Sequence, residues 1–258
     1  MISDEHVNFL KKIKREKIYV NFARFFILFL FLIIWQLLAS NNLINTFLFS
    51  SPFKVVSTLY NLFLENDLLI HISITLFEVI ISFILSVCIG IIIASIMWSF
   101  NFFYKIIDPY LTILNSLPKV ALGPLIIIWF GASMKSIIVM SILISVFIMI
   151  INVYQGFIST NKDYITMAKS FGANKWQLFR YIVFPSNMNN IISALKISIS
   201  MNLIGVIMGE LLVSKKGIGY LIMYGSQIFN IDLIITCIFI LGIISYFMYL
   251  LINKKSRH

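Results

Sequence analysis

Long apolar segments separated by short polar ones make up most of this chain. Six of the apolar segments approach or exceed the roughly 20 residues that a helix needs to cross a bilayer core about 30 Å thick. They cover residues 22–39, 70–98, 109–130, 136–157, 187–213 and 231–252. The pattern therefore predicts an all-α membrane protein with six transmembrane helices.

The third apolar segment, 109–130, contains Pro118, Gly123 and Pro124. Because proline removes a backbone donor and clashes with the preceding turn, we expect this span to be kinked or unwound. Unwound backbone at membrane depth is tolerated only where protein or a water-filled cavity surrounds it, so the segment is expected inside the bundle. Lys119 follows the first proline and could attract an anionic solute or make a structural contact; the residues leave both open.

Two polar stretches are long enough to fold locally. Residues 40–69 predict an outer loop that carries a short amphipathic helix. In 159–185, Ile165, Ala168 and Lys169 recur at helical spacing, and Gly172 is placed to end that helix with a left-handed turn. A second amphipathic helix is expected to end at Pro185. This helix–glycine–helix loop could enter a groove of a soluble partner or rest on lipid headgroups.

Composition and charge agree with a membrane protein. The chain has 258 residues, 60% hydrophobic and 12% charged, with a mean hydropathy of +0.98, whereas about a quarter of a soluble domain is charged. The net charge of +10 does not indicate nucleic-acid binding, because basic residues gather before the first span and after the last. We expect a basic head, 1–21, a transmembrane domain, 22–252, that includes the loop 159–185, and a tail, 253–258.

The distribution of charge also predicts an orientation. With the amino terminus in the cytoplasm, the segments on that side hold fourteen Lys and Arg residues, and the segments on the other side hold four. Basic residues are enriched on the cytoplasmic side of membrane proteins and contact anionic lipid there. Both termini and the loop 159–185 are therefore expected in the cytoplasm.

Few residues inside the spans could carry chemistry. Glu210, near the outer end of the fifth span, could line a gate or could bond to neighbouring backbone, since a carboxylate at this depth is costly unless it is paired or functional. Glu78 is the other acid within a span. The cysteines and histidines show neither a disulfide framework nor a metal-ligand spacing. No GxxxxGK[ST] phosphate loop or catalytic constellation is found, so no ATPase site and no cofactor is expected.

Several motifs, in order, resemble those of one transporter family. The segment Thr166-Met-Ala-Lys-Ser-Phe-Gly-Ala173, followed by Phe184-Pro185, is similar to the coupling-helix motif of binding-protein-dependent ABC importers. Two further regions resemble the third and fifth spans of permeases in the nitrate/sulfonate/taurine group. They are Leu117-Pro-Lys-Val-Ala-Leu-Gly-Pro-Leu125 with Trp129-Phe-Gly131, and Glu210-Leu-Leu with Gly217-Ile-Gly-Tyr-Leu221. The resemblance covers about residues 70–250.

The chain departs from this family pattern at two places. Thr166 and Met167 stand where the family has a Glu and the first Ala of its coupling motif. A neutral helix at this position would couple through packing or would dock a divergent partner. Glu78 stands where family members often carry a basic residue.

The resemblance implies the permease fold of type I ABC importers, as in the methionine importer, in a bacterial plasma membrane. It implies two copies of this chain, an external solute-binding protein, and a separate ATP-binding cassette ATPase. The residues expected to contact the ATPase are Thr166, Met167, Ala168, Gly172 and Pro185. Those expected to line or gate the pathway are Pro118, Lys119, Pro124 and Glu210.

The implied cargo is a small organic anion such as a sulfonate, nitrate or taurine. A pyrimidine or another vitamin precursor is the alternative within the same importer type. Outside it, an ion-gradient-driven secondary transporter and a non-transport scaffold are the remaining alternatives.

Overall fold

The computed structural model describes residues 4–65 and 67–255, and within these ranges every regular element is helical. The first half comprises α1 (Asp4–Ser40), α2 (Thr46–Phe49), α3 (Pro52–Leu64), α4 (Asp67–Ser99), α5 (Asn101–Ser116), the 3₁₀ turn η1 (Lys119–Leu122) and α6 (Gly123–Phe130). The second half comprises α7 (Met134–Ile158), α8 (Lys162–Ser170), α9 (Lys175–Leu178), the π-helical turn η2 (Phe179–Val183), α10 (Phe184–Ser186), α11 (Met188–Val213), α12 (Ile218–Gln227) and α13 (Ile231–Lys255).

Five helical segments of the described chain are long and apolar enough to cross a membrane by themselves. These are Ile18–Ser40, Asp67–Ser99, Met134–Ile158, Met188–Val213 and Ile231–Asn253. A sixth span is the bent pair Asn101–Ser116 and Lys119–Phe130, whose two parts meet at 88°. The predicted all-α membrane fold with six spans is confirmed, with the break of the third span at Pro118 as expected.

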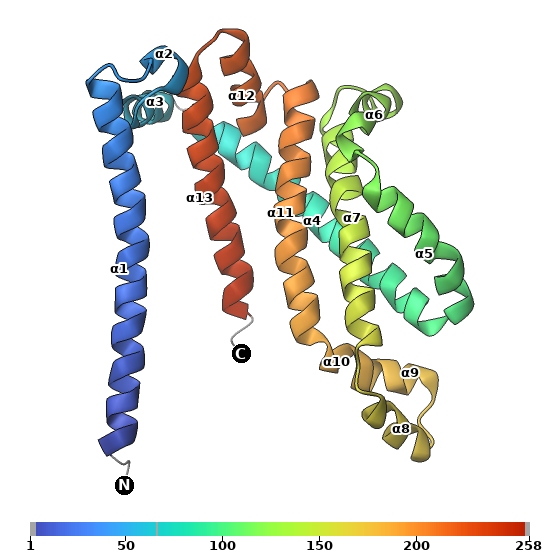
Figure 1. Cartoon of the computed structure of the whole chain (residues 1–258). Helices are drawn as coiled ribbons and strands as arrows, with labels where there is room; N and C mark the ends of the chain where they lie inside the picture. The colour runs from blue at the N-terminus through green and yellow to red at the C-terminus, as the bar shows by residue number, and fades with distance from the viewer. Residues whose placement is uncertain (1–3, 66, 256–258) are drawn as a thin grey trace.

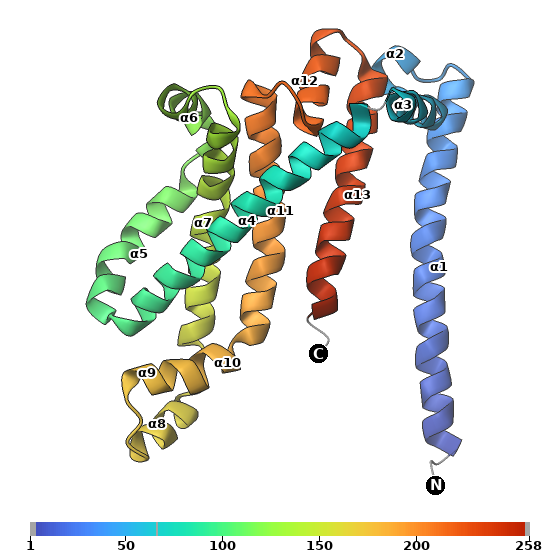
Figure 2. The ribbon, with the colours of Figure 1, turned by 180° about the vertical axis from the view of Figure 1, so that it is seen from behind.

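Helices α4, α7 and α11 form the centre of the bundle, where α7 packs extensively against both of the others. Figure 1 shows α1, α13, α11 and α7 side by side, with α8–α10 at one end of the bundle, which we call the loop end. In Figure 2, α4 crosses obliquely over α7 and α11. Both ends of the described chain lie in the half of the molecule that carries the loop end.

A buried network of hydroxyl and amide groups joins the three central helices. The side chain of Asn202 on α11 accepts hydrogen bonds from Ser141 (3.0 Å) and Ser145 (3.1 Å) of α7 and donates to Ser86 of α4 (3.0 Å). Oγ of Ser82 on α4 lies 2.9 Å from Oγ of Ser141 and is an alternative acceptor for that single hydroxyl proton. Because these polar groups satisfy one another, they can be buried at membrane depth and hold the helices together.

Close packing of α7 against α11 depends on small residues. A Cβ added at Gly205 would lie 2.5 Å from Cα of Ser141, and one added at Gly209 would lie 3.0 Å from Cα of Ile137. The GxxxG spacing of the two glycines on α11 therefore brings two spans of the same chain together.

The third span begins earlier than the sequence pattern predicts. Helix α5 starts at Asn101, and Pro109, the expected start, lies inside it. The polar residues Lys105 and Asp108 suggested a connecting loop, but they stand three residues apart on an exposed face, so the helix carries them without burying a charge.

The two remaining prolines also differ from expectation. Pro124 occupies the first turn of α6, where its missing N–H has no helical partner to lose, so it begins a helix. Pro185 was expected to end the second loop helix; instead it lies in the first turn of α10, directly after the π-helical turn.

Outside the central helices, α3 forms the amphipathic helix predicted for 40–69. Most of the spanning part of α1 is exposed within the single chain, with Trp35 stacked on Phe239 of α13 at a ring distance of 6.1 Å. The first three residues of the expected head and residues 256–258 of the expected tail lie outside the described residues.

Candidate functional site

The loop 159–185 folds into two helical segments joined at Gly172. Asn161 caps α8, its side chain accepting a hydrogen bond from the backbone N–H of Asp163 (2.8 Å). Gly172 then adopts φ +79°, and its N–H bonds to the carbonyl of Lys169 (2.9 Å). Asn174 and Gln177 form a reciprocal cap at the start of α9, with both bonds at 2.8 Å. The predicted helix–glycine–helix shape is present.

This loop presents an apolar surface that no described residue covers. Phe171 is 84% exposed, and Tyr164, Met167 and Trp176 are also exposed. Thr166 donates to the carbonyl of Lys162 in its own helix (2.9 Å) and so has no hydroxyl proton to offer a partner. In Figure 1 the loop extends past the ends of α7, α11 and α13. We call these four exposed residues, Tyr164, Met167, Phe171 and Trp176, the knob.

The base of the loop is packed firmly onto the bundle. Phe179, in the π-helical turn, lies 5.3 Å from the rings of both Phe157 on α7 and Trp98 on α4. Asn187 is buried and donates to Thr160 Oγ1 (2.6 Å) and to the carbonyl of Val183 (2.8 Å). The loop is thus fixed to α4, α7 and α11 through buried contacts, and its exposed part is the knob.

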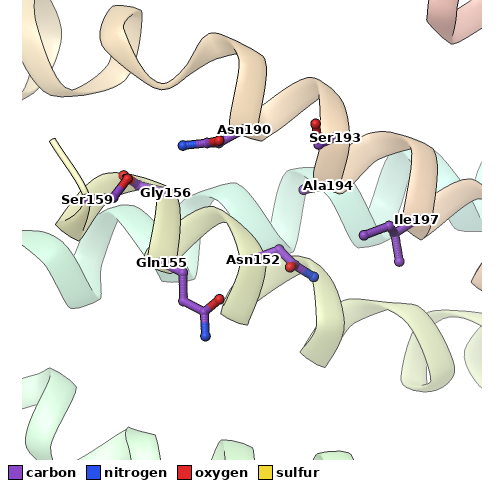
Figure 3. Close-up of a pocket in the computed structure, with 8 residues that line it drawn as sticks. All are labelled: Asn152, Gln155, Gly156, Ser159, Asn190, Ser193, Ala194 and Ile197. Carbon is purple, nitrogen blue, oxygen red and sulfur yellow. The ribbon is translucent and has the colours of Figure 1, made fainter.

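A polar cleft of about 270 Å³ lies next to the loop, between the last turns of α7 and the first turns of α11. Figure 3 shows its lining, with Asn152, Gln155 and Ser159 coming from α7 and its C-cap and Asn190 and Ser193 from α11. Gly156 and Ala194 form the floor; a Cβ at Gly156 would lie 3.0 Å from Cβ of Asn190, so the two helices nearly touch there.

The cleft residues were not singled out from the sequence. Asn152 and Gln155 on one span are three residues apart, and so are Asn190 and Ser193 on another. That spacing puts each pair on one helix face. The signal was therefore present, but only the fold shows that the two polar faces meet.

Glu210 lies in the interior at the opposite end of the bundle, 1% exposed. Its carboxylate accepts hydrogen bonds from Thr75 Oγ1 (2.6 Å) and from the backbone N–H of Gly219 (2.5 Å). Thr75 and His71 of α4 in turn accept from the N–H groups of Ile218 (2.9 Å) and Gly217 (2.8 Å). The free N–H groups at the start of α12 are therefore capped by side chains from α4 and α11. Of the two roles considered for Glu210, bonding to backbone is the one that its contacts display.

Glu78 is buried beside Glu210, and its Oε2 has no hydrogen-bond partner among the described residues. This chain therefore places a second acid beside Glu210. The junction of α11 with α12 depends on the capping contacts of Glu210.

Lys119 bridges the break in the third span. Its Nζ donates to the carbonyl (3.2 Å) and to Oδ1 (3.0 Å) of Asn115, and lies 5.7 Å from the ring centre of Phe147. The four residues expected to line a route do not form one group: Pro118, Lys119 and Pro124 shape the α5–α6 bend, whereas Glu210 joins α4, α11 and α12. Among the described residues, no group of three or more His, Cys, Asp or Glu side chains is placed to hold a metal.

Comparison with protein families decides the classification. Residues 86–258 match the family described as "Binding-protein-dependent transport system inner membrane component". The chain belongs to this family. It is an ABC importer permease, a transport subunit of the bacterial plasma membrane whose ATPase is a separate subunit, as predicted.

Curated relatives align with most of the permease. A Haemophilus influenzae protein, named a probable ABC transporter permease protein, is 31% identical over 86% of this chain and 90% of its own length. The formylaminopyrimidine transport permease protein ThiX of Halalkalibacterium halodurans is 28% identical, with coverages of 88% and 90%. The taurine transport system permease protein TauC of Escherichia coli K12 is 23% identical, with coverages of 88% and 84%.

Solved structures confirm the type I importer fold. One chain of the MetNI methionine ABC transporter, in inward-facing conformations, superimposes with a TM-score of 0.67 at 18% identity, covering 74% of this permease and 94% of that chain. A second crystal form gives a TM-score of 0.68 at 17% identity, covering 75% and 96%.

Proposed function

We propose that two copies of this permease form one solute pathway and that the knob on each copy docks into a groove of the ATPase. The loop end and both termini face the cytoplasm, and the binding protein delivers cargo at the opposite end. ATP-driven closure of the ATPases moves the loops and rocks the two bundles between inward-open and outward-open states.

The observation that carries this proposal is the knob itself. Its apolar side chains lie at the surface of a short, well-capped element, where they need a partner to leave water. The helix presents no acidic contact at Thr166 and Met167, so docking relies on apolar packing, in the manner of a helix placed in a groove.

The base of the loop supports a role in transmitting motion. A force on the knob passes through Phe179 and Asn187 into α4, α7 and α11, because those contacts are buried and closely packed. Gly172 permits the turn between the two loop helices, since φ +79° is disfavoured for other residues except Asn and Asp. The N–H of Ala173 closes that turn by donating to the carbonyl of Ala168 (3.0 Å). Pro185 sits at the junction with α11.

The polar cleft supports the pathway part of the proposal. Uncharged polar groups such as Gln155 are costly to expose to lipid, so this face of α7 and α11 borders water or another protein surface. We assign it to the inner half of the pathway between the two copies. Pro118, Lys119, Pro124 and Glu210 lie farther toward the opposite end and shape the outer half.

The cargo is proposed as a small polar organic solute. A relative named for taurine and a relative named for formylaminopyrimidine both align with nearly the whole permease, so a sulfonate-type anion and a pyrimidine vitamin precursor are the two classes to compare.

Co-purification tests the docking assignment. Tagged permease is isolated gently from its own membranes, and the accompanying ATPase is quantified by mass spectrometry. F171D should abolish ATPase recovery, because it puts a charge in the centre of the apolar knob. F229D is the matched control: Phe229 is 72% exposed, lies near the opposite end, and has a positive φ that Asp tolerates. Full ATPase recovery with F171D would refute docking through the knob.

A further inference from the structure

Two carboxyl groups lie in contact inside the bundle, away from the polar cleft and the knob. Glu78 of α4 and Glu210 of α11 are each 1% exposed, and their side chains are within hydrogen-bonding reach of each other. Two ionised carboxyl groups cannot form a hydrogen bond, because each offers only acceptors. Their contact therefore requires a proton or another cation between them.

No described basic side chain supplies that cation. The ion pair found among the described residues joins Lys54 to Asp232 (3.8 Å), and His71 of α4 uses Nδ1 to accept from the backbone N–H of Gly217. None of the other ionisable side chains around this end of α4 bonds to either carboxyl group. They are Asp67 on α4, Lys135 on α7, Lys215 and Lys216 before α12, Tyr220 and Tyr224 on α12, and Cys237 on α13.

A metal ion fits this place poorly. An oxygen-ligated cation such as Ca²⁺ takes about six to eight oxygen ligands. Among the described residues, no group of three or more His, Cys, Asp or Glu side chains is placed to hold a metal. The nearby hydroxyl of Thr75 is already used, since it donates to Glu210 and accepts from the N–H of Ile218. A proton needs only the two carboxyl oxygens that it joins.

The hydrogen bonds around the pair place this proton on Glu78. Glu210 accepts from Thr75 Oγ1 (2.6 Å) and from the N–H of Gly219 (2.5 Å), and it lies at the start of α12, where free N–H groups favour a negative charge. Oε2 of Glu78 receives no hydrogen bond from the described residues. An ionised Glu78 would be an unpaired buried charge, whereas a neutral Glu78 can donate to the carboxylate of Glu210.

We propose that Glu78 and Glu210 form a proton-binding site, in which Glu78 is a carboxylic acid that donates a hydrogen bond to the carboxylate of Glu210. Thr75 and Glu78 stand three residues apart on one face of α4, so both donors reach Glu210 from the same helix. The bound proton thus joins α4 to the junction of α11 with α12. This site goes beyond the proposed function and does not depend on docking of the knob.

Infrared spectroscopy of the permease–ATPase complex tests for the proton directly. Near neutral pH, exposed carboxyl groups are ionised, whereas a buried carboxylic acid has a separate carbonyl band that shifts when the complex is prepared in D₂O. The difference spectrum between the unmodified complex and E78Q should contain this band. The difference spectrum for E65Q, which changes an exposed carboxyl group, should not contain it. Absence of the band from the E78Q difference would overturn the proposal.

Thermal melts of two substitutions at position 78 provide a second test. The carboxamide of E78Q keeps a donor toward Glu210, so this variant should melt close to the unmodified complex at neutral pH. E78L removes the donor and should melt lower. If Glu78 were ionised, both substitutions would relieve the repulsion between two buried charges, and both variants would melt higher. That outcome would reject a protonated Glu78.

The pH dependence of the melts distinguishes a proton from a metal ion. A folded state that holds one proton more than the unfolded state loses stability as the pH rises, by up to about tenfold per pH unit in the folding equilibrium constant. The melting temperature of the unmodified complex should therefore fall relative to that of E78Q between about pH 6 and about pH 9. A difference that does not change with pH would refute the site, and one that follows the concentration of Na⁺ or Ca²⁺ instead would assign it to a metal ion.

Discussion

At the scale of single residues, Glu210 has the most demanding position in the permease. It is buried, it accepts one hydrogen bond from Thr75 and one from the backbone of Gly219, and a Cβ placed on Gly217 would collide with its carboxylate. Glycine at 217, with φ +114°, is thus required both for the turn and for the space next to Glu210. These residues form one unit that joins α11 to α12.

We predict that E210Q destabilises the permease by about 1–3 kcal/mol. The carboxamide nitrogen of glutamine cannot accept a hydrogen bond, so either the hydroxyl of Thr75 or the N–H of Gly219 would face another donor. A thermal melt of the purified complex in detergent measures the effect. E65Q, at an exposed position after α3, should melt like the unmodified protein. An E210Q protein that melts at the same temperature would show that the capping contacts contribute nothing to stability.

At the scale of elements, the packing of α7 on α11 depends on glycines whose local helix propensity is poor. In an exposed helix, replacing Gly with Ala stabilises by about 0.5–1 kcal/mol. At Gly205, however, the new methyl would meet the backbone of Ser141, and at Gly242 on α13 it would meet nothing within 4 Å. The same substitution should therefore have opposite effects on two helices of one molecule.

We predict that G205A lowers stability by about 1–3 kcal/mol through overpacking, with a fall in the yield of monodisperse protein on size-exclusion chromatography. The separation of α7 from α11 would also stretch the bonds between Asn202 and the serines of α7. G242A should be neutral or slightly stabilising. If both variants behave alike, helix propensity outweighs packing at this contact.

The elements also show how far the sequence alone could lead. Apolar length predicts the spans, and the glycine at 172 predicts the turn between α8 and α9, because both signals are local. The start of α5 was missed because a proline such as Pro109 can sit inside a membrane helix, where it resembles a helix start in sequence. The cleft was missed because Asn152 and Asn190 belong to different helices, and no local pattern says which helices touch.

At the scale of the whole molecule, the positive-inside distribution and the arrangement of the helices lead to the same proposed orientation. The loop end and both ends of the described chain share one half of the bundle, and the α11–α12 connection with Lys215 lies at the other end. If the knob docks a cytoplasmic ATPase, then position 215 must face the outside.

We predict that a membrane-impermeant maleimide labels K215C in intact cells, whereas K169C on α8 is labelled only after the membrane is opened. Both positions are exposed, and the C88A background removes the exposed native thiol. The reverse pattern would invert the orientation and exclude docking of the knob on a cytoplasmic ATPase. Labelling of both sites in intact cells would indicate a leaky preparation, which a cytoplasmic marker protein detects.

The π-helical turn Phe179–Val183 has a consequence for how insertions and deletions are tolerated in this region. A π turn is an α-helix with one extra residue, and each residue of an α-helix corresponds to about 100° of rotation. Removing one residue between 179 and 183 would convert the turn to regular α-helix and swing α8 and α9 by about that angle relative to α10. The one extra residue of the π turn therefore sets the direction in which the knob points from the bundle. Deleting one residue there would change this direction without altering any residue of the knob.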